Sequence, residues 1–242
     1  MTLKTDTLGW LLNTQVVLSA ASIFLPKSIR QWTWRAILPL AIAIITTRWI
    51  AVGHPPMRNL FEAFLWLPPL LTGMTFYSAW RDKVDTARLD AILGFIVAFP
   101  LAFVFSAQEG RLPPVLQSPL FVPHVLGYMI AYVLLTRAFF LECLKQVSAS
   151  RENAAWGFAF ISLALALGSY WGNEAWGAYW QWDPKEQWSL ATWLIYAAYF
   201  HLRGHRKWRL ALLGIGVVFI LLTVTWINLS KLFSGMHSYA GV

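Results

Sequence analysis

The chain has 242 residues, of which 58% are hydrophobic and only 12% are charged, whereas a typical soluble domain carries about 25% charged residues. So few charged side chains cannot cover a water-facing surface, which excludes a chain built of one or two soluble domains. The formal net charge of +8 does not indicate a nucleic-acid partner, because the basic residues lie between long apolar segments, as they do in membrane-flanking loops.

Eight segments are long and apolar enough to cross a bilayer as helices, which takes roughly 17–25 residues. They span residues 8–25, 36–52, 60–77, 89–107, 121–143, 154–170, 188–203 and 210–229. Prolines at positions 39, 68, 69 and 100 are expected to kink or partly break these helices, since neighbouring helices can satisfy the freed carbonyls. The sequence therefore predicts an all-α, polytopic integral membrane protein that forms a single domain over residues 1–242.

The basic residues set the predicted orientation, because cytoplasmic loops carry the excess of lysine and arginine. Twelve lie in one set of loops and five on the other side. The twelve are Lys27, Arg30, Arg35, Arg81, Lys83, Arg88, Lys145, Arg151, Arg203, Arg206, Lys207 and Arg209; the five are Lys4, Arg58, Arg111, Lys185 and Lys231. The first set is placed in the cytoplasm, so both termini are predicted to lie outside.

Three of the five histidines fall on the predicted outer side: His54 before the third span, His124 at the start of the fifth, and His237 after the eighth. His201 lies late in the seventh span, towards the cytoplasm, and His205 follows in a basic loop. Histidine within a membrane span indicates a functional site by default, and neutral imidazole is a common ligand of iron. His54 lies in a loop-like Gly-His-Pro-Pro stretch, which favours a structural role, while a role in haem binding stays open.

The outer loop predicted at residues 171–188 is rich in tryptophan. Six of the fifteen tryptophans lie between Trp171 and Trp193, interleaved with glycine and charged residues. An ordinary aromatic belt would spread its indoles over many helix ends. Indoles offer large flat faces with one N–H donor each, which favours a platform for a flat ligand. Haem meets the demands of an aromatic surface, flanking histidines and nearby cations, although quinone or lipid remain open on residue chemistry alone.

Four motifs resemble one known family of haem-handling membrane proteins. The stretch WGAYWQWDPKE at 176–186 is similar to the family's tryptophan-rich WWD signature, in the form of the CcsA (ResC) branch of system II cytochrome c biogenesis. Residues 53–62 (GHPPMRNLFE), 116–125 (LQSPLFVPHV) and 235–239 (GMHSY) resemble three further family segments. The chain is short for the CcsA branch and closer in length to the CcmC branch, which is the alternative.

The resemblance implies roles for particular residues. His124 and His237 would be axial iron ligands at the outer face, and His201 would bind haem iron nearer the cytoplasm. The haem platform would consist of Trp171, Trp176, Trp180, Trp182 and Asp183. The sequence does not choose among Arg58, Arg111 and Lys185 as partners of the haem propionates.

The resemblance also implies a function in which haem b is the transported substrate. The chain would bring haem to the outer face for covalent attachment to an apocytochrome c with a Cys-x-x-Cys-His segment, as part of a cytochrome c synthase (haem lyase) complex with a CcsB-like partner. Its single cysteine, Cys143, is expected at the inner end of the fifth span, so the chain would supply no outer thiol. The implied location is the bacterial inner membrane with a periplasmic active face, or a plastid thylakoid membrane.

Two other functions stay open at this point. One is a CcmC-like carrier that loads haem onto a chaperone without ligation. The other is an electron-transfer subunit with permanently bound haem, although such subunits typically place paired histidines inside the helical bundle.

Overall fold

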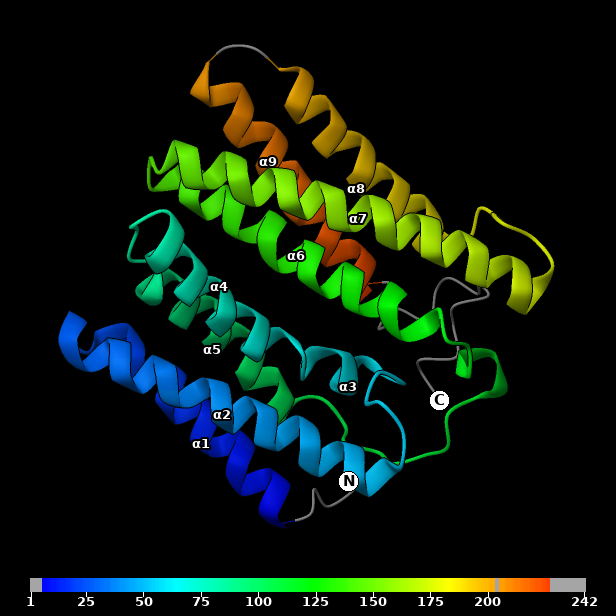
Figure 1. The fold of residues 1–242 in the computed structure, drawn as a ribbon, viewed down its shortest axis with the longest axis horizontal. Coiled ribbons are helices and arrows are strands. Elements are labelled where there is room, and N and C mark those ends of the chain that lie inside the picture. The colour runs from blue at the N-terminus through cyan, green and yellow to red at the C-terminus, as the bar shows by residue number, and fades with distance from the viewer. Residues whose placement is uncertain (1–5, 203–204, 227–242) are drawn as a thin grey trace. The chain divides into compact units, whose positions relative to one another are not determined.

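The computed structural model describes residues 6–202 and 205–226, and every regular element in that part of the chain is helical, as predicted (Figure 1). The helices are α1 (Asp6–Phe24), α2 (Lys27–Val52), α3 (Leu60–Phe64), α4 (Leu67–Arg81), α5 (Ala87–Phe103), α6 (Phe121–Cys143), α7 (Val147–Trp176), α8 (Pro184–His201) and α9 (Arg206–Leu221). A 3-10 turn, η1 (Pro114–Leu116), precedes α6, and a π-helical turn, η2 (Leu222–Trp226), continues α9.

Among the described residues, five helices are long and apolar enough to cross a membrane: Thr7–Phe24, Lys27–Val52, Phe121–Cys143, Val147–Trp176 and Arg206–Thr225. Large apolar side chains such as Phe24, Ile50 and Val218 are exposed along these helices, as a lipid-facing surface requires. The chain is therefore a polytopic membrane protein. Eight spans with both termini outside stay a prediction, because α4, α5 and α8 are not among these five helices.

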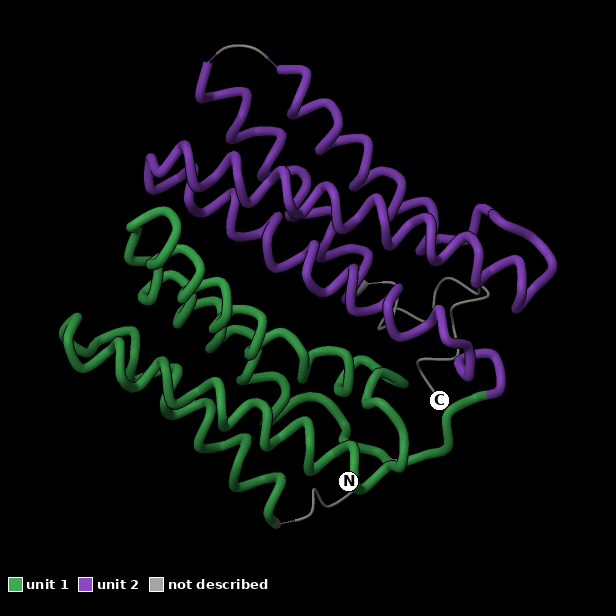
Figure 2. The backbone as a smooth tube through the Cα atoms, viewed as in Figure 1, with its two compact units in different colours: residues 1–113 green, residues 114–242 purple. Residues whose placement is uncertain are grey.

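The chain divides into two compact units, residues 1–113 and 114–242, each of which is described by itself (Figure 2). Whether they form the single domain expected over residues 1–242 is not tested by this division, and that expectation stays a prediction. Unit 1 holds α1 to α5, and unit 2 holds η1, α6 to α9 and η2.

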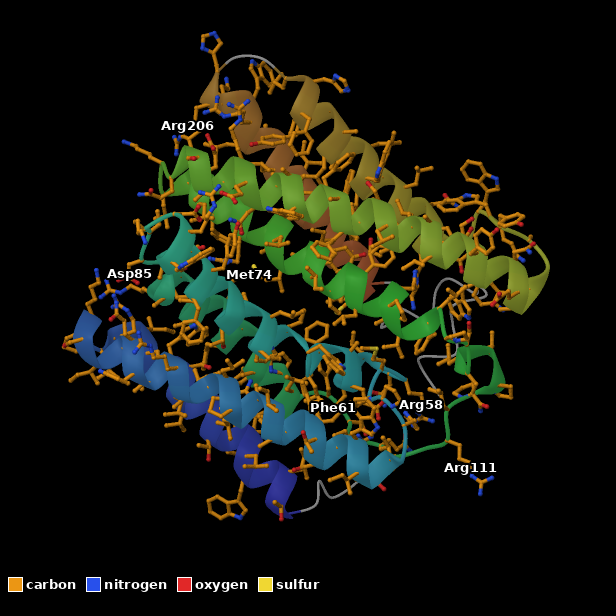
Figure 3. All side chains as sticks on the ribbon, in the orientation of Figure 1. Arg58, Phe61, Met74, Asp85, Arg111 and Arg206 are labelled. Carbon is orange, nitrogen blue, oxygen red and sulfur yellow. The ribbon has the colours of Figure 1, made fainter. Side chains whose placement is uncertain are left out.

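Unit 1 is a bundle in which α1 packs on α2 and α5, while α4 packs on α2 and α5. Trp34 is buried at its centre and donates a hydrogen bond of 2.7 Å to Thr75 Oγ1. At one end Arg30 and Lys27 lie 3.5 and 3.6 Å from the carboxylate of Asp85, which joins the start of α2 to the chain before α5 (Figure 3).

The span predicted at residues 60–77 is interrupted in the structure. The helix ends after Phe64 and starts again at Leu67, with Pro68 in the first turn of α4. Proline lacks a backbone N–H and clashes with the preceding turn, but it is well tolerated where a helix begins. This break confirms the expected effect of the proline pair, whereas Pro39 lies inside an uninterrupted α2.

Unit 2 contains a closely packed pair of helices, α6 and α7, joined by a short turn, with α8 and α9 completing the bundle (Figure 1). Small residues permit the close approach: a Cβ on Gly127 would lie 3.2 Å from Ala164 Cβ, and one on Gly157 would lie 2.7 Å from Leu135, as is common between membrane helices. Because consecutive helices are antiparallel, α6 and α8 run in the same direction, and their first residues share one end of the unit.

At the opposite end of unit 2, an ion-pair network ties α9 to α6. Arg209 donates from Nε and Nη2 to Glu142 Oε1, at 3.1 and 2.9 Å. Arg206 donates to the backbone carbonyl of Glu142 at 2.8 Å, and it lies at the start of α9 (Figure 3). The free carbonyls at a helix C-terminus carry partial negative charge, which accounts for the arginine there.

Candidate functional site

The tryptophan-rich segment is shorter as a loop than predicted. Helix α7 continues to Trp176 and α8 begins at Pro184, so the loop covers residues 177–183 instead of 171–188. Gly177 ends α7 with φ at +76° and donates its N–H to Asn173 O at 3.0 Å. The prediction followed hydropathy, which falls at residues 172–174, whereas a helix continues until a residue such as glycine takes the left-handed conformation.

Asp183 closes the loop by capping α8. Its carboxylate accepts the N–H of Glu186 at 3.0 Å, and Glu186 Oε2 accepts the N–H of Asp183 at 3.1 Å, which is a capping box. Glu186 Oε2 also accepts the N–H of Gln181 at 2.8 Å. The two acidic residues of the tryptophan-rich motif thus fix the loop backbone on the first turn of α8.

Trp182 lies at the end of the loop, directly before Asp183. Trp182 has a positive φ of 58°, which is costly for a bulky residue, and Gln187 Nε2 donates to its carbonyl. Its indole is 65% exposed and meets the ring of Trp180 edge to face at 6.1 Å between centroids. Backbone strain at an exposed aromatic side chain is typical of residues held for binding.

His124 lies in the first turn of α6, at the same end of unit 2 as the loop. Its Nδ1 lies 2.8 Å from the carbonyl oxygen of Ala164 on α7. A carbonyl oxygen only accepts, so Nδ1 carries the proton and the lone pair of the neutral ring is on Nε2. A Cβ on Gly168 would lie 2.3 Å from His124 Cε1 and 2.5 Å from Nδ1, so only glycine leaves room for the ring there.

Aromatic rings surround the imidazole. Tyr128 meets it edge to face at 5.1 Å between centroids, and the ring of Trp171 lies 5.6 Å away, tilted by 43°. Trp171 is 1% exposed, donates its indole N–H to Val115 O at 2.9 Å, and contacts Trp176 at 5.0 Å. We call His124, Tyr128, Trp171 and Trp176 the His124 cluster.

The structure therefore brings His124, Trp171 and Trp176 into one cluster and places Trp180, Trp182 and Asp183 in the adjoining loop. His201 is the last residue of α8 and is exposed, at the other end of unit 2 from His124. His237 lies outside the described residues. Within residues 6–202 and 205–226, no three His, Cys, Asp or Glu side chains come together as a metal site. Haem iron does not need such a group, because one imidazole on each side of the iron is enough.

The three candidate propionate partners differ in environment. Lys185 lies in the first turn of α8, ahead of the apolar segment that begins at Trp188. Burial lowers the pKa of its ammonium to about 8, and the Asp183 carboxylate opposes this shift. Arg111 is exposed in the loop after α5. Arg58 lies before α3, with its guanidinium against Gly110.

His54 contacts backbone carbonyls through both ring nitrogens: Nδ1 lies 3.0 Å from Pro55 O and Nε2 3.2 Å from Gly110 O. These contacts agree with the structural interpretation. Sequence reasoning missed Gly168, Ala164 and Tyr128. The spacing of four residues from His124 could have indicated Tyr128, whereas no local pattern indicates which α7 residue faces His124.

Comparisons with known proteins give the family. Residues 11–237 match the model of the family described as cytochrome C assembly protein. The chain is 31% identical over 252 residues to the cytochrome c biogenesis protein CcsA of Synechococcus sp. (strain CC9902), covering 83% of each chain. It is 28% identical to the protein of that name from Chlamydomonas reinhardtii, covering 83% of this chain and 65% of that relative.

A solved structure shares the fold. The cytochrome c heme lyase CcmF matches with a TM-score of 0.61 at 16% identity, over 93% of this chain and 48% of that chain. At this identity the likeness concerns the fold alone. Together with the family match, the described helices and the tryptophan-rich motif lead to one conclusion: the chain belongs to the cytochrome c assembly protein family, as a CcsA-type cytochrome c biogenesis protein of the membrane.

Proposed function

We propose that this chain receives haem b in the membrane and presents it at the outer face for covalent attachment to an apocytochrome c. The observation that carries the proposal is the fixed imidazole of His124, whose Nδ1 lies 2.8 Å from Ala164 O at the same end of unit 2 as the tryptophan-rich loop. A histidine that donates one ring N–H to a backbone carbonyl is oriented and made more basic at the other nitrogen, as metal-bound histidines are.

The tryptophan-rich loop fits haem in two further respects. Trp182 and Tyr179 expose flat aromatic side chains on the loop, on which a macrocycle can stack. The capping box of Asp183 and Glu186 holds that loop in place. Neither residue is one of the histidines proposed to bind iron. In this proposal His124 binds iron on one side and His237 on the other.

His201 is assigned to a separate, inner haem position. It lies at the far end of unit 2 from His124, and α6 alone accounts for a length of about 35 Å at 1.5 Å per residue. One histidine at each end supports transfer of haem from the cytoplasmic half to the outer face. A CcsB-like partner supplies the second ligand of the inner position.

The chain contributes binding and orientation to the covalent step. Each apocytochrome thiol adds across a haem vinyl group, so that a carbon–sulfur bond forms, the thiol hydrogen ends on the neighbouring carbon, and no electrons are gained or lost overall. The only cysteine, Cys143, ends α6 and is exposed there, so both thiols belong to the apocytochrome. Holding thiols and vinyls together can contribute several kcal/mol to such a reaction. We therefore assign the chain to a cytochrome c synthase (haem lyase) complex.

The proposal includes a topology of eight spans with both termini outside. It places the chain in a bacterial inner membrane with the His124 end facing the periplasm, with the thylakoid membrane as the alternative. Arg206, Lys207 and Arg209 in the first turn of α9, at the His201 end of unit 2, support this orientation.

A maturation assay tests the function. The chain is co-expressed with a CcsB-like partner and a reporter apocytochrome, and covalent haem is measured on the reporter. We expect His124→Ala to abolish covalent haem and His205→Ala, which removes an exposed histidine at the other end of unit 2, to leave it unchanged. Undiminished maturation by His124→Ala would contradict the proposal. Haem binding without any maturation, with every partner present, would favour the CcmC-like carrier.

A further inference from the structure

Two arginines near the end of unit 1 that contains His54 have opposite environments. Arg48, on α2, is 1% exposed, and four of the five N–H donors of its guanidinium have acceptors. It donates from Nε and Nη2 to Glu62 Oε1 at 3.0 and 2.7 Å. It also donates from Nη1 to Ala107 O at 2.9 Å and from Nη2 to Gln108 O at 3.0 Å. The charge of Arg48 is thus used to hold the chain after α5 against α2.

The Arg58 guanidinium packs against the loop after α5, and no residue in the described part of the chain accepts a hydrogen bond from it. Its guanidinium lies over Gly110: a Cβ there would be 2.1 Å from Nη1, 2.6 Å from Cζ and 3.0 Å from Nη2. Its Nε is buried with no hydrogen-bond partner in the described part of the chain. The side chain is partly exposed, so the terminal nitrogens are the donors that a ligand can reach.

The carboxylates that could neutralise Arg58 are engaged elsewhere. Glu62 gives Oε1 to Arg48 and accepts the backbone N–H of Arg58 on Oε2 at 2.8 Å. Glu109 lies 3.6 Å from Arg48 Nη1. His54 Nε2 lies 3.2 Å from Gly110 O, which supports the peptide under the guanidinium.

Arg111, one residue beyond Gly110, provides the contrast. It is exposed and extends away from unit 1, whereas Arg58 lies against the loop (Figure 3). Of these two arginines, Arg58 is the one whose guanidinium packs against the loop with a buried Nε that no described residue uses.

We propose that Arg58 is the receptor for an oxyanion, a carboxylate or a phosphate. A planar guanidinium presents N–H donors in a fixed geometry that matches both groups, and the terminal nitrogens of Arg58 are the donors that such a group would bind. The carboxylate would come from a haem propionate, and that source rests on the proposed function. The phosphate would come from the headgroup of an anionic lipid, and that source does not.

Two binding measurements on the full chain in nanodiscs test the receptor and separate its sources. The first titrates haem and haem dimethyl ester, following the fluorescence of the fifteen tryptophans. The second counts the phosphatidylglycerol molecules retained per chain by native mass spectrometry. The variants are Arg58→Gln, which removes the donors, and Gly110→Ala, whose Cβ displaces the guanidinium and leaves the charge in place. Arg111→Gln is the control, because it removes the same charge from an unanchored side chain.

If the oxyanion is a propionate, Arg58→Gln and Gly110→Ala weaken haem binding about tenfold, which is ~1.4 kcal/mol, and leave the binding of the ester unchanged. If it is a lipid phosphate, both variants lose retained phosphatidylglycerol while Arg111→Gln keeps it. The proposal is overturned if both variants match Arg111→Gln in both measurements. Failure of the unaltered chain to bind haem counts against the proposed function. The lipid measurement then decides whether Arg58 binds an oxyanion.

Discussion

Replacing Gly168 by alanine tests whether α7 positions the imidazole of His124. The added Cβ would lie 2.3 Å from His124 Cε1 and 2.5 Å from Nδ1, whereas ordinary contacts begin at 3.4 Å. The ring must therefore move by about 1 Å to restore normal contact distances. A movement of that size stretches the 2.8 Å hydrogen bond to Ala164 O towards the limit of about 3.5 Å, beyond which it no longer holds the ring.

The expected loss is in haem affinity and not in the stability of the helix. Removing an interaction that orients a metal ligand typically costs about 10- to 100-fold in metal affinity, or ~1.4–2.7 kcal/mol. Alanine is a better helix former than glycine by about 1 kcal/mol, so α7 itself is not weakened. Gly157→Ala is the matched control, because its Cβ crowds Leu135 on the same pair of helices, at 2.7 Å, away from His124.

Two measurements on the full chain in nanodiscs decide the outcome. Haem titration followed by absorbance gives the affinity, and histidine ¹⁵N NMR without haem reports whether Nδ1 still carries the proton. We expect Gly168→Ala to weaken haem binding and to disturb the Nδ1–H signal of His124, and Gly157→Ala to do neither. Unchanged affinity and an unchanged His124 signal in Gly168→Ala would refute the positioning argument, as would an equal loss in Gly157→Ala.

Three further predictions concern stability, measured as thermal or denaturant unfolding of the purified chain. Glu62→Ala leaves the buried charge of Arg48 without its partner and is expected to cost ~3–5 kcal/mol. Glu109→Gln, at a carboxylate 55% exposed and 3.6 Å from the same guanidinium, should change stability by less than about 1 kcal/mol; similar losses in both would contradict this ranking. Asp183→Ala removes the cap of α8 and should cost ~0.5–2 kcal/mol, whereas Asp183→Asn, which keeps a capping oxygen, should cost less; the opposite order would show that the cap does not hold the loop. The pKa of Lys185 is about 8 in the folded chain against a usual value of 10.5, so between these values the unfolded chain binds more protons and stability should rise with pH; Lys185→Met should flatten that rise, and an unaltered rise would assign it to other groups.

Much of the fold could be predicted from the sequence, because bilayer-crossing helices need long apolar runs. The segment predicted at residues 121–143 coincides with α6, and the interruption of the third span falls at the Pro68–Pro69 pair. The end of α7 could not be predicted from hydropathy, since its last turn is polar and the helix continues to Gly177.

The candidate site was predictable in composition and not in contacts. His124 and the tryptophans were identifiable from residue chemistry, but the pairing of His124 with Ala164 and Gly168 depends on how α6 and α7 are aligned, about 40 residues apart in the chain. Likewise Arg48 was recognisable as a charge within a span, while its partners Glu62 and the carbonyls at 107 and 108 follow from the folded loop.

The central claim is that His124 binds haem iron, and replacing its imidazole tests this most directly. The chain is purified with its partner as His124→Gly, and its haem spectrum is recorded before and after addition of free imidazole. We expect the low-spin spectrum of two imidazole ligands to be lost in His124→Gly and restored by added imidazole. A low-spin spectrum that is the same in His124→Gly and in the unaltered chain, with no response to imidazole, would contradict it.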